Sequence, residues 1–378
     1  MVDAIVAQLQ ARGVAVRLWT QNSNDIGATL RPRAKAFVSG VYSFAAARTM
    51  LEVLRTEKPD IVHVHNLLPL FSPSVLLSCK RAHVPVVMTC HNYRLICPTG
   101  KFDRNGQICE RCAGGREYWC ALTNCRRDVL QSIGYALRNA VHRRYRLYLD
   151  NVALFLAISN CVRERLIEAG IPQEQVRVLP NMVSIPDSAA HPATGQYIGF
   201  VGRVVPHKGV DTLLEAAALT GLPTRVAGDC TFMPQARKAA PKGVVFTGVL
   251  RGDEVAQFYR EARCIVVPSK CREGFGLVAA EAMSHGVPVI ASRIGALPKI
   301  VEDGVTGLLF EPGNVGGLAE MMVRIWEDSE LCQRLGAAAR QKAVREYAPE
   351  TYCQNLLSAY REALRFSSSR TMFNHGTA

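Results

Sequence analysis

The sequence predicts an α/β protein with two Rossmann-like, doubly wound domains. Short apolar runs typical of buried strands alternate with amphipathic runs typical of helices. A length of 378 residues exceeds what one hydrophobic core usually supports. A stretch containing Pro, Ala and Ser near the middle of the chain has the composition of a linker. We therefore predict an N-terminal domain over 1–182, a linker over 183–196, a C-terminal domain over 197–364 and a tail over 365–378.

The individual elements follow from this alternation. The chain opens within an amphipathic helix, whose apolar face carries Val2, Ile5, Val6 and Leu9. In the N-terminal domain we predict strands at Val14–Trp19, Asp60–His65, Val84–Cys90 and Val152–Ile158, and helices at Ser43–Arg55, Pro73–Ala82 and Asn160–Ala169. In the C-terminal domain we predict strands at Tyr197–Val201, Thr224–Ala227, Val244–Thr247, Cys264–Val267 and Val287–Ala291, a helix at Leu277–His285, and helices over most of the chain after Pro312.

The composition indicates a cytoplasmic protein. Hydrophobic residues make up 48% of the chain, and no apolar run approaches the ~20 residues that a membrane-spanning helix needs. We find no signal peptide. Thirteen cysteines in such a chain indicate a reducing compartment. Peripheral attachment to the inner face of the plasma membrane remains open.

Positive charge is concentrated in the first half of the chain. Of the net charge of +13, residues up to Ala190 contribute 24 basic and 14 acidic side chains. This excess favours an anionic partner, such as a phosphate-bearing acceptor or an anionic membrane surface. No recognised nucleic-acid-binding motif accompanies the charge, so we expect no nucleic-acid partner.

The basic residues cluster between Arg126 and Arg146. Apolar residues recur there at helical spacing: Val129, Leu130, Ile133, Leu137, Val141 and Tyr145. Arginines flank this stripe: Arg138, Arg143, Arg144 and Arg146. Two interpretations are open. The segment is an ordinary surface helix with its apolar side toward the core, or a helix that lies on a membrane surface.

Two glutamates eight positions apart lie on a predicted strand-to-helix loop. The run Glu273-Gly-Phe-Gly-Leu-Val-Ala-Ala-Glu281 follows the strand that ends at Val267. The carboxyl ends of parallel strands are where open α/β sheets bind ligands. N–H groups at a helix start attract phosphate, and carboxylates can pair with sugar hydroxyls. The loop suits a sugar nucleotide, whereas the spacing alone also fits two glutamates on a solvated helix face.

A second strand-to-helix loop carries two cations. Gly202-Arg-Val-Val-Pro-His-Lys208-Gly209 follows the predicted strand Tyr197–Val201, with Arg203 and Lys208 five positions apart. Two cations on such a loop can neutralise a diphosphate and the charge that develops on it. An exposed basic turn would explain this loop, but not both loops in one domain.

With both loops present, the chain resembles the retaining GT-B glycosyltransferases, specifically glycosyltransferase family 4. The resemblance covers roughly Val2 to Leu364. Besides the two loops, it rests on Thr89-Cys-His91-Asn92, Leu179-Pro-Asn181, Gly304-Val-Thr-Gly307-Leu-Leu-Phe310 and Glu311-Pro312. It implies two Rossmann-like domains that face a cleft, an N-terminal acceptor side and a C-terminal nucleotide-sugar side. It also implies that the last helices, near Glu350–Leu364, cross back.

The resemblance implies roles for individual residues. Arg203 and Lys208 would stabilise the departing diphosphate, Glu273 would contact donor-sugar hydroxyls, and Glu281 would hold the ribose. The remaining donor contacts would come from Gly202, Gly274, Phe275, Gly276 and Leu277. His91 would contribute to the catalytic centre from the acceptor side; alternatively, it is a structural histidine held by backbone hydrogen bonds. We interpret His63 and His65 as core or sheet-end histidines.

The implied reaction is metal-independent transfer of a hexosyl group, with retention, from a UDP- or GDP-sugar to a polysaccharide or lipid-linked acceptor of the cell envelope. The chain contains no Asp-x-Asp pair, which metal-dependent transferases use to hold a divalent ion. We therefore expect no cofactor to be required for catalysis. Two other functions remain open: a GT-B nucleotide-sugar epimerase, and a non-catalytic sugar-nucleotide-binding protein.

One feature departs from the family pattern. Members normally begin with a strand and a glycine-rich loop, and this chain opens in the helix that follows them. That strand lies in the middle of the family's N-terminal sheet, and the loop approaches the donor phosphates. We expect either a start codon further upstream or a truncated copy of uncertain activity.

A cysteine-rich insertion follows His91. Five cysteines lie within 97–125, and a Cys-x2-Cys pair with further thiols can form a tetrahedral zinc site. A structural zinc ion would be held by Cys97, Cys109, Cys112 and Cys125, with Cys120 the spare. Reactive thiols and inert buried cysteines are the alternatives. Such a zinc ion would not be catalytic.

Overall fold

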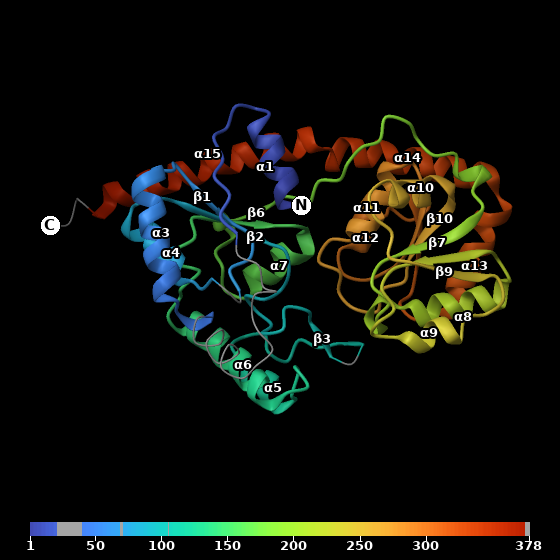
Figure 1. The fold of residues 1–378 in the computed structure, drawn as a ribbon, viewed down its shortest axis with the longest axis horizontal. Coiled ribbons are helices and arrows are strands. Elements are labelled where there is room, and N and C mark those ends of the chain that lie inside the picture. Colours follow the sequence, from blue (N-terminus) through green and yellow to red (C-terminus); the bar gives the residue numbers. More distant parts are fainter. Residues whose placement is uncertain (21–39, 69–70, 105, 375–378) are drawn as a thin grey trace. The chain divides into compact units, whose positions relative to one another are not determined.

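The computed structural model describes residues 1–20, 40–68, 71–104 and 106–374. They form two compact units, each with a parallel β-sheet and helices, as the α/β prediction requires (Figure 1). Unit 1 comprises Met1–Lys101, Glu110–Leu179 and Cys353–Ala378, and unit 2 comprises Phe102–Cys109 and Pro180–Tyr352. Each unit is described by itself.

Unit 1 is built on a four-stranded parallel sheet. Its strand order is β1 (Val62–Val64), β2 (Val86–Cys90), β5 (Leu154–Ala157) and β6 (Val176–Val178). Every residue of the two central strands is buried, which is typical of a parallel sheet covered on both faces. The helices of its Rossmann-like part are α1 (Val2–Gln10), α3 (Phe44–Glu57), α4 (Ser74–Arg81) and α7 (Asn160–Glu168). Ser43 and Ser159 cap α3 and α7 by accepting N–H bonds.

The predicted strand Val14–Trp19 is wrong. Residues 14–20 have no regular secondary structure, although helix α1 before them lies where predicted. A strand needs a neighbour that takes up its backbone hydrogen bonds. Within the described residues, β1 pairs with β2 alone, and no pairing links residues 14–20 to β1 or to any other strand.

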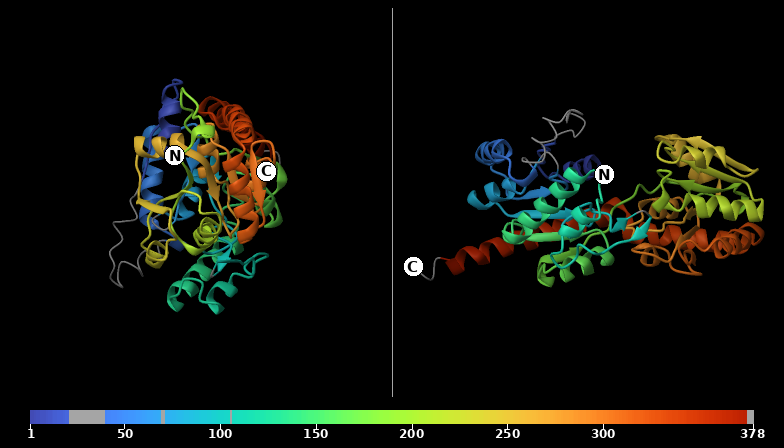
Figure 2. Two further views of the ribbon diagram at one scale, coloured as in Figure 1. Left: turned by 90° about the vertical axis from the view of Figure 1, so that its right-hand side faces the viewer. Right: turned by 90° about the horizontal axis from the view of Figure 1, so that it is seen from below.

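The cysteine-rich insertion and the segment after it form a small hairpin and two helices. The hairpin is β3 (Asp103–Arg104) and β4 (Gln107–Ile108), which belong to unit 2. Helices α5 (Tyr118–Leu122) and α6 (Val129–Arg144) belong to unit 1 and pack against each other. Figures 1 and 2 show them at one edge of unit 1, beyond its sheet.

Unit 2 contains a six-stranded parallel sheet. Its order is β12 (Gly307–Phe310), β11 (Val289–Ser292), β10 (Ala262–Val267), β7 (Tyr197–Val201), β8 (Thr224–Ala227) and β9 (Val244–Gly248). Alternate residues of β7 point to opposite faces of the sheet. Ile198 and Phe200 join the core beneath α8 (Val210–Thr220) and α13 (Val315–Glu327), whereas Gly199 faces Phe258 of α10 (Asp253–Glu261). The other helices of the unit are α9 (Pro234–Lys238), α11 (Leu277–Ser284), α12 (Leu297–Ile300) and α14 (Ser329–Tyr347).

The observed boundaries differ from the predicted ones at the linker and at the tail. Residues 183–196, predicted as a linker, lie against unit 2, where the Val183 N–H donates to the Tyr347 carbonyl at 2.9 Å. Helix α15 (Pro349–Asn374) extends into the predicted tail, and its residues from Cys353 onward group with unit 1. Strands β6 and β12 were not among the predicted strands.

Candidate active site

The basic loop of unit 2 lies where the sequence places it, at the carboxyl end of β7. It continues through a 3-10 turn at Pro206–Lys208 into α8. Arg203 is exposed, and Lys208 is partly buried. Gly209 has a φ of +70°, and a Cβ there would lie 1.8 Å from the carbonyl oxygen of Pro268. A side chain cannot fit at Gly209, so the two loops of this site touch through their backbones.

The acidic loop follows β10, the strand that pairs with β7. Its Glu273 carboxylate accepts from the Lys208 ammonium at 2.5 Å and from the Ser269 hydroxyl at 2.5 Å. Burial alone would raise the pKa of Glu273, but the charge of Lys208 and these two hydrogen bonds hold it below its ordinary value. Glu273 therefore stays ionised beside a cation in a partly desolvated site.

A neighbouring turn supports the backbone of Glu273. The N–H of Ala296 donates to the Glu273 carbonyl at 3.0 Å. Gly295 has a φ of +60°, and a Cβ there would lie 2.6 Å from both the nitrogen and the oxygen of Glu273. The sequence analysis did not identify Gly295 or Ser269. The glycine before the Ala-Leu pair was the available signal, but its partner is 22 positions away.

Glu281 lies on α11, one turn inside the helix as predicted. Its carboxylate accepts from the hydroxyl of Tyr259 at 2.9 Å, and burial raises its pKa although this hydrogen bond acts in the opposite direction. Tyr259 is fully buried and comes from α10, so it fixes the side chain of Glu281. Tyr259 was also missed, because nothing local links it to position 281.

The residues between the two glutamates form the start of α11. Gly274 and Gly276 are partly buried, Phe275 is buried with its ring edge-on to Tyr347 at 5.5 Å, and Leu277 is exposed. Gly276 has a φ of +111°, which a side chain rarely adopts. The structure thus brings Lys208 and Glu273 into contact, with the predicted backbone donors beside them.

His91 belongs to unit 1 and lies in a row of histidines at the ends of β1 and β2. Its Nε2 is 2.8 Å from Nδ1 of His65, and the two rings stack at 5.2 Å. The ring of His63 lies 4.3 Å from that of His65, with its nitrogens 2.7 Å from the hydroxyls of Thr89 and Tyr360. His63 was interpreted as a core or sheet-end histidine, and its partly buried hydrogen bonds agree with that.

Burial keeps this row of histidines neutral. It lowers the pKa of His65 to about 4, with a further contribution from His91, and it lowers the pKa of His91 and His63 as well. Since a hydrogen bond between two imidazoles needs one donor and one acceptor, the neutral forms can bond to each other. His65 therefore orients His91, which the sequence analysis did not foresee.

The thiols of the insertion lie partly together. Cys112 and Cys120 are buried in one apolar cluster with Ala136 of α6, and Cys125 packs against it. Burial, followed by the proximity of Cys125, Cys112 and Cys97, raises the pKa of Cys120. Cys109 is partly buried and belongs to unit 2. Cys120, which was left as the spare, therefore lies near Cys125, Cys112 and Cys97. Among the described residues, no three His, Cys, Asp or Glu side chains are placed to hold a metal ion, so zinc binding stays a prediction.

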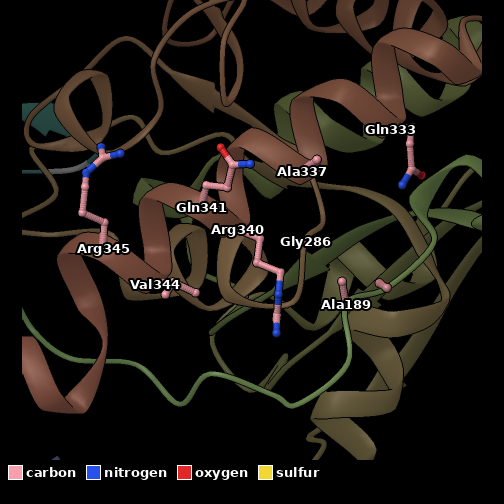
Figure 3. Close-up of a pocket in the computed structure, with 9 residues that line it drawn as sticks. Ala189, Gly286, Gln333, Ala337, Arg340, Gln341, Val344 and Arg345 are labelled. Atoms are coloured by element: carbon pink, nitrogen blue, oxygen red, sulfur yellow. The ribbon is translucent and has the colours of Figure 1, made fainter.

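A cavity of about 480 Å³ lies elsewhere in unit 2 (Figure 3). It is lined by Ala189 and Gly286 and by side chains of α14, including Arg340. The guanidinium of Arg340 is already committed to the carbonyl oxygens of Ser284 and Pro186, both at 2.5 Å. The cavity contains none of the predicted donor-binding residues, so we do not assign it to the active site.

Comparison with known proteins identifies the family. The model described as Glycosyltransferase Family 4 matches residues 1–185, and the model described as Glycosyl transferases group 1 matches residues 184–342. An uncharacterized glycosyltransferase of Methanocaldococcus jannaschii is 38% identical over 38% of this chain and 41% of that relative. The sulfoquinovosyl transferase of Arabidopsis thaliana is 37% identical over 38% of the chain and 29% of that relative. These two alignments span less than half of either relative.

Alignments that cover more of the chain, at lower identity, also match glycosyltransferases. The N-acetyl-alpha-D-glucosaminyl L-malate synthase of Bacillus anthracis is 24% identical over 86% of this chain and 80% of that relative. Among solved structures, HepE of Anabaena in complex with UDP has a TM-score of 0.64 at 19% identity, covering 94% of this chain and 88% of that one. Sucrose-phosphate synthase of Thermosynechococcus elongatus has a TM-score of 0.66 at 21% identity, covering 96% and 92%. The two family models together cover residues 1–342, and the chain belongs to the glycosyltransferases of family 4 and has the GT-B fold.

Proposed function

We propose that the chain transfers a hexosyl group, with retention of anomeric configuration, from a nucleoside diphosphate sugar to a glycan or lipid-linked acceptor. The observation that carries this proposal is the contact between Lys208 and Glu273, which come from two loops at the carboxyl ends of adjacent strands. A cation beside an ionised carboxylate suits a donor that has a diphosphate at one end and sugar hydroxyls at the other.

In this mechanism the two cations act on the leaving group. The bond between the anomeric carbon and the diphosphate oxygen breaks, and the electron pair stays on the diphosphate, next to Lys208 and Arg203. The acceptor hydroxyl attacks the same face of the sugar, and its proton passes to the departing diphosphate oxygen. Glu273 accepts hydrogen bonds from sugar hydroxyls, because its pKa stays low. With two cations in this role and no Asp-x-Asp pair in the sequence, we propose that no divalent metal is needed.

The nucleoside and the acceptor occupy different parts of the protein in this proposal. Glu281, held by Tyr259, binds the ribose hydroxyls. His91, oriented by His65, serves the acceptor side as a neutral imidazole. UDP is the first nucleotide to test, because the similar HepE structure was solved in complex with UDP. The excess of basic residues up to Ala190 favours a phosphate-bearing, lipid-linked acceptor used at the inner face of the plasma membrane in cell-envelope synthesis.

Calorimetric titration with UDP and GDP tests the donor site. The parent protein should bind one of them, and the double variant Arg203→Ala, Glu281→Ala should lose that binding. A matched control replaces Glu320 and Arg324, an exposed pair of the same charges on α13, and should bind as the parent does. Failure of the folded parent to bind either nucleotide would refute the donor-site assignment.

Activity assays then separate the proposed transferase from its alternatives. Incubation with a UDP-sugar and candidate acceptors should give a product with the anomeric configuration of the donor. A change in the sugar that needs no acceptor would identify an epimerase instead. Nucleotide binding with neither hydrolysis nor transfer would identify a non-catalytic sugar-nucleotide-binding protein.

A further inference from the structure

Helix α6 is turned the opposite way from an ordinary surface helix. Its buried residues are small or polar: Ser132, Gly134, Ala136, Arg138, Asn139 and His142. Its apolar stripe faces solvent instead, with Leu130 78%, Ile133 47% and Leu137 51% exposed. A helix that packs on a core for stability buries its apolar stripe. The stripe of α6 therefore serves something other than the core of unit 1.

Specific contacts hold α6 in this orientation. The amide of Asn139 donates to the Arg94 carbonyl at 2.7 Å, and the guanidinium of Arg138 donates to the Pro98 carbonyl at 3.3 Å. The Ser132 hydroxyl accepts from the Arg126 N–H at 3.0 Å. The polar side of the helix thus supplies hydrogen bonds to the loop after His91 and to the turn before α6, and rotating the helix would break them.

Exposed apolar side chains also occur on α5, the helix that packs against α6. Val129, one turn before Ile133, is 56% exposed, and Tyr118 and Leu122, one turn apart on α5, are 53% and 70% exposed. Figure 1 shows α5 and α6 at one edge of unit 1, so these side chains are carried by two helices that pack against each other. Single exposed apolar residues are ordinary, but clusters on adjoining helices mark interaction surfaces.

The positive charge around these apolar side chains indicates what kind of partner they bind. Between Arg111 and Arg146 the chain carries eight arginines and two acidic residues. Arg126 and Arg127 are exposed just before the stripe, and Arg144 is exposed two turns after Leu137, on the same side of the helix. Apolar side chains bordered by arginines are typical of helices that lie in the interface of an anionic bilayer. A second copy of this chain would bring the same positive charge against itself.

We propose that α5 and α6 form a docking face for an anionic lipid bilayer, with Leu122, Leu130, Ile133 and Leu137 entering the acyl boundary. Arg127 and Arg144 would lie at the level of the phosphate headgroups. Among the described residues, no helix is both long and apolar enough to cross a membrane. The proposed contact is made by the exposed faces of α5 and α6, and it does not depend on the donor site of unit 2.

Flotation of the full chain with vesicles tests the proposal. The parent should bind vesicles that contain phosphatidylglycerol and should bind pure phosphatidylcholine at least about tenfold more weakly. The variant Leu130→Gln, Leu137→Gln should lose about tenfold or more in binding, because it removes two side chains from the acyl boundary. The variant Arg127→Gln, Arg144→Gln should lose a similar factor on the anionic vesicles alone.

Matched controls address folding and general charge. Leu219→Gln with Phe232→Gln removes two side chains that are 68% and 66% exposed in unit 2, and it should bind vesicles as the parent does. All variants should keep the parent's circular dichroism and nucleotide affinity, since every replaced side chain is exposed. Equal vesicle binding by the parent and the Leu130, Leu137 variant would overturn the proposal. So would parent binding that needs no anionic lipid, or a dimer in sedimentation that this variant abolishes.

Discussion

Replacing Gly209 with alanine should disrupt the donor site, whereas the same change at Gly221 should not. The two glycines flank helix α8 and have nearly equal φ angles, +70° and +66°. At both positions, alanine in this left-handed backbone conformation costs about 1 kcal/mol of folding free energy. They differ in their surroundings: a Cβ at Gly221 meets no atom within 4 Å, and a Cβ at Gly209 lies 1.8 Å from the Pro268 oxygen.

The steric difference sets the magnitude. A Cβ and a carbonyl oxygen need more than 3 Å, so in the Gly209 variant the two loops must separate by over an ångström. Forcing such a shift in a packed site costs roughly 2–3 kcal/mol beyond the backbone penalty. We expect about 1 kcal/mol of destabilisation for Gly221→Ala and about 3–4 kcal/mol for Gly209→Ala. At about 3 °C per kcal/mol, the melting temperature of unit 2 should fall by about 3 °C and about 10 °C.

Unfolding of unit 2 can be followed separately. Trp326 packs against the core of unit 2, and the other two tryptophans belong to unit 1. In a Trp19→Phe, Trp119→Phe background, fluorescence therefore reports on unit 2. Nucleotide affinity of the Gly209 variant should fall at least about tenfold, because Pro268 leads into the loop of Glu273 and Gly209 follows Lys208. Equal losses of stability in the two glycine variants, with nucleotide affinity unchanged in both, would refute the steric argument.

Three further predictions concern charge and metal. Lys208→Met should raise the pKa of Glu273. In the parent, the ionised Glu273 stabilises the fold above the ordinary pKa of a glutamate, and this stabilisation is lost as the pH falls. The variant should lose about 1–2 kcal/mol of it, which urea unfolding at several pH values measures. The parent should lose stability as the pH falls from 6.5 to about 4, because the unfolded chain takes up a proton at His65 that the folded chain excludes, and His65→Gln should reduce this loss. Urea unfolding at pH 7 and pH 5 measures the loss, and the control His191→Gln, at an exposed histidine, should leave it unchanged. If the insertion holds a structural zinc ion, the purified protein should contain about one zinc per chain, and Cys112→Ser should lower its melting temperature. Protein that contains no zinc, and whose melting temperature a chelator does not change, would contradict the zinc site.

Local signals in the sequence predict the fold and the donor loops well. Strand β10, the glycines after it and helix α11 follow one another within a short segment, so hydrophobic pattern and glycine placement identify the loop of Glu273. Its partners are less accessible from sequence. Lys208 lies 65 positions from Glu273, and the pattern within each loop does not predict that the two side chains meet.

Long-range partners explain what the sequence analysis missed. The nitrogens of His63 bond Thr89, 26 positions away, and Tyr360, 297 positions away, and no local pattern predicts such contacts. Tyr259 reaches Glu281 from a different helix in the same way. The wrong prediction of a strand at Val14–Trp19 has a different cause, because here a local signal was present and the long-range partner was missing among the described residues. Its alternation of apolar residues is a local signal, but a strand also requires a neighbour, which the pattern does not supply.

The orientation of α6 shows why periodicity alone left two interpretations open. Periodicity gives the helix and its apolar stripe, but not the direction in which the stripe points. That direction depends on the loop after His91, in which the partly buried carbonyl of Arg94 and the buried carbonyl of Pro98 need donors. Asn139 and Arg138 supply them from the polar side of the helix, so the leucines on the other side must face outward. The exposed apolar stripe of α6 therefore follows from the hydrogen bonds on its polar side, and the proposed bilayer contact would remove the free-energy cost of exposing that stripe to water.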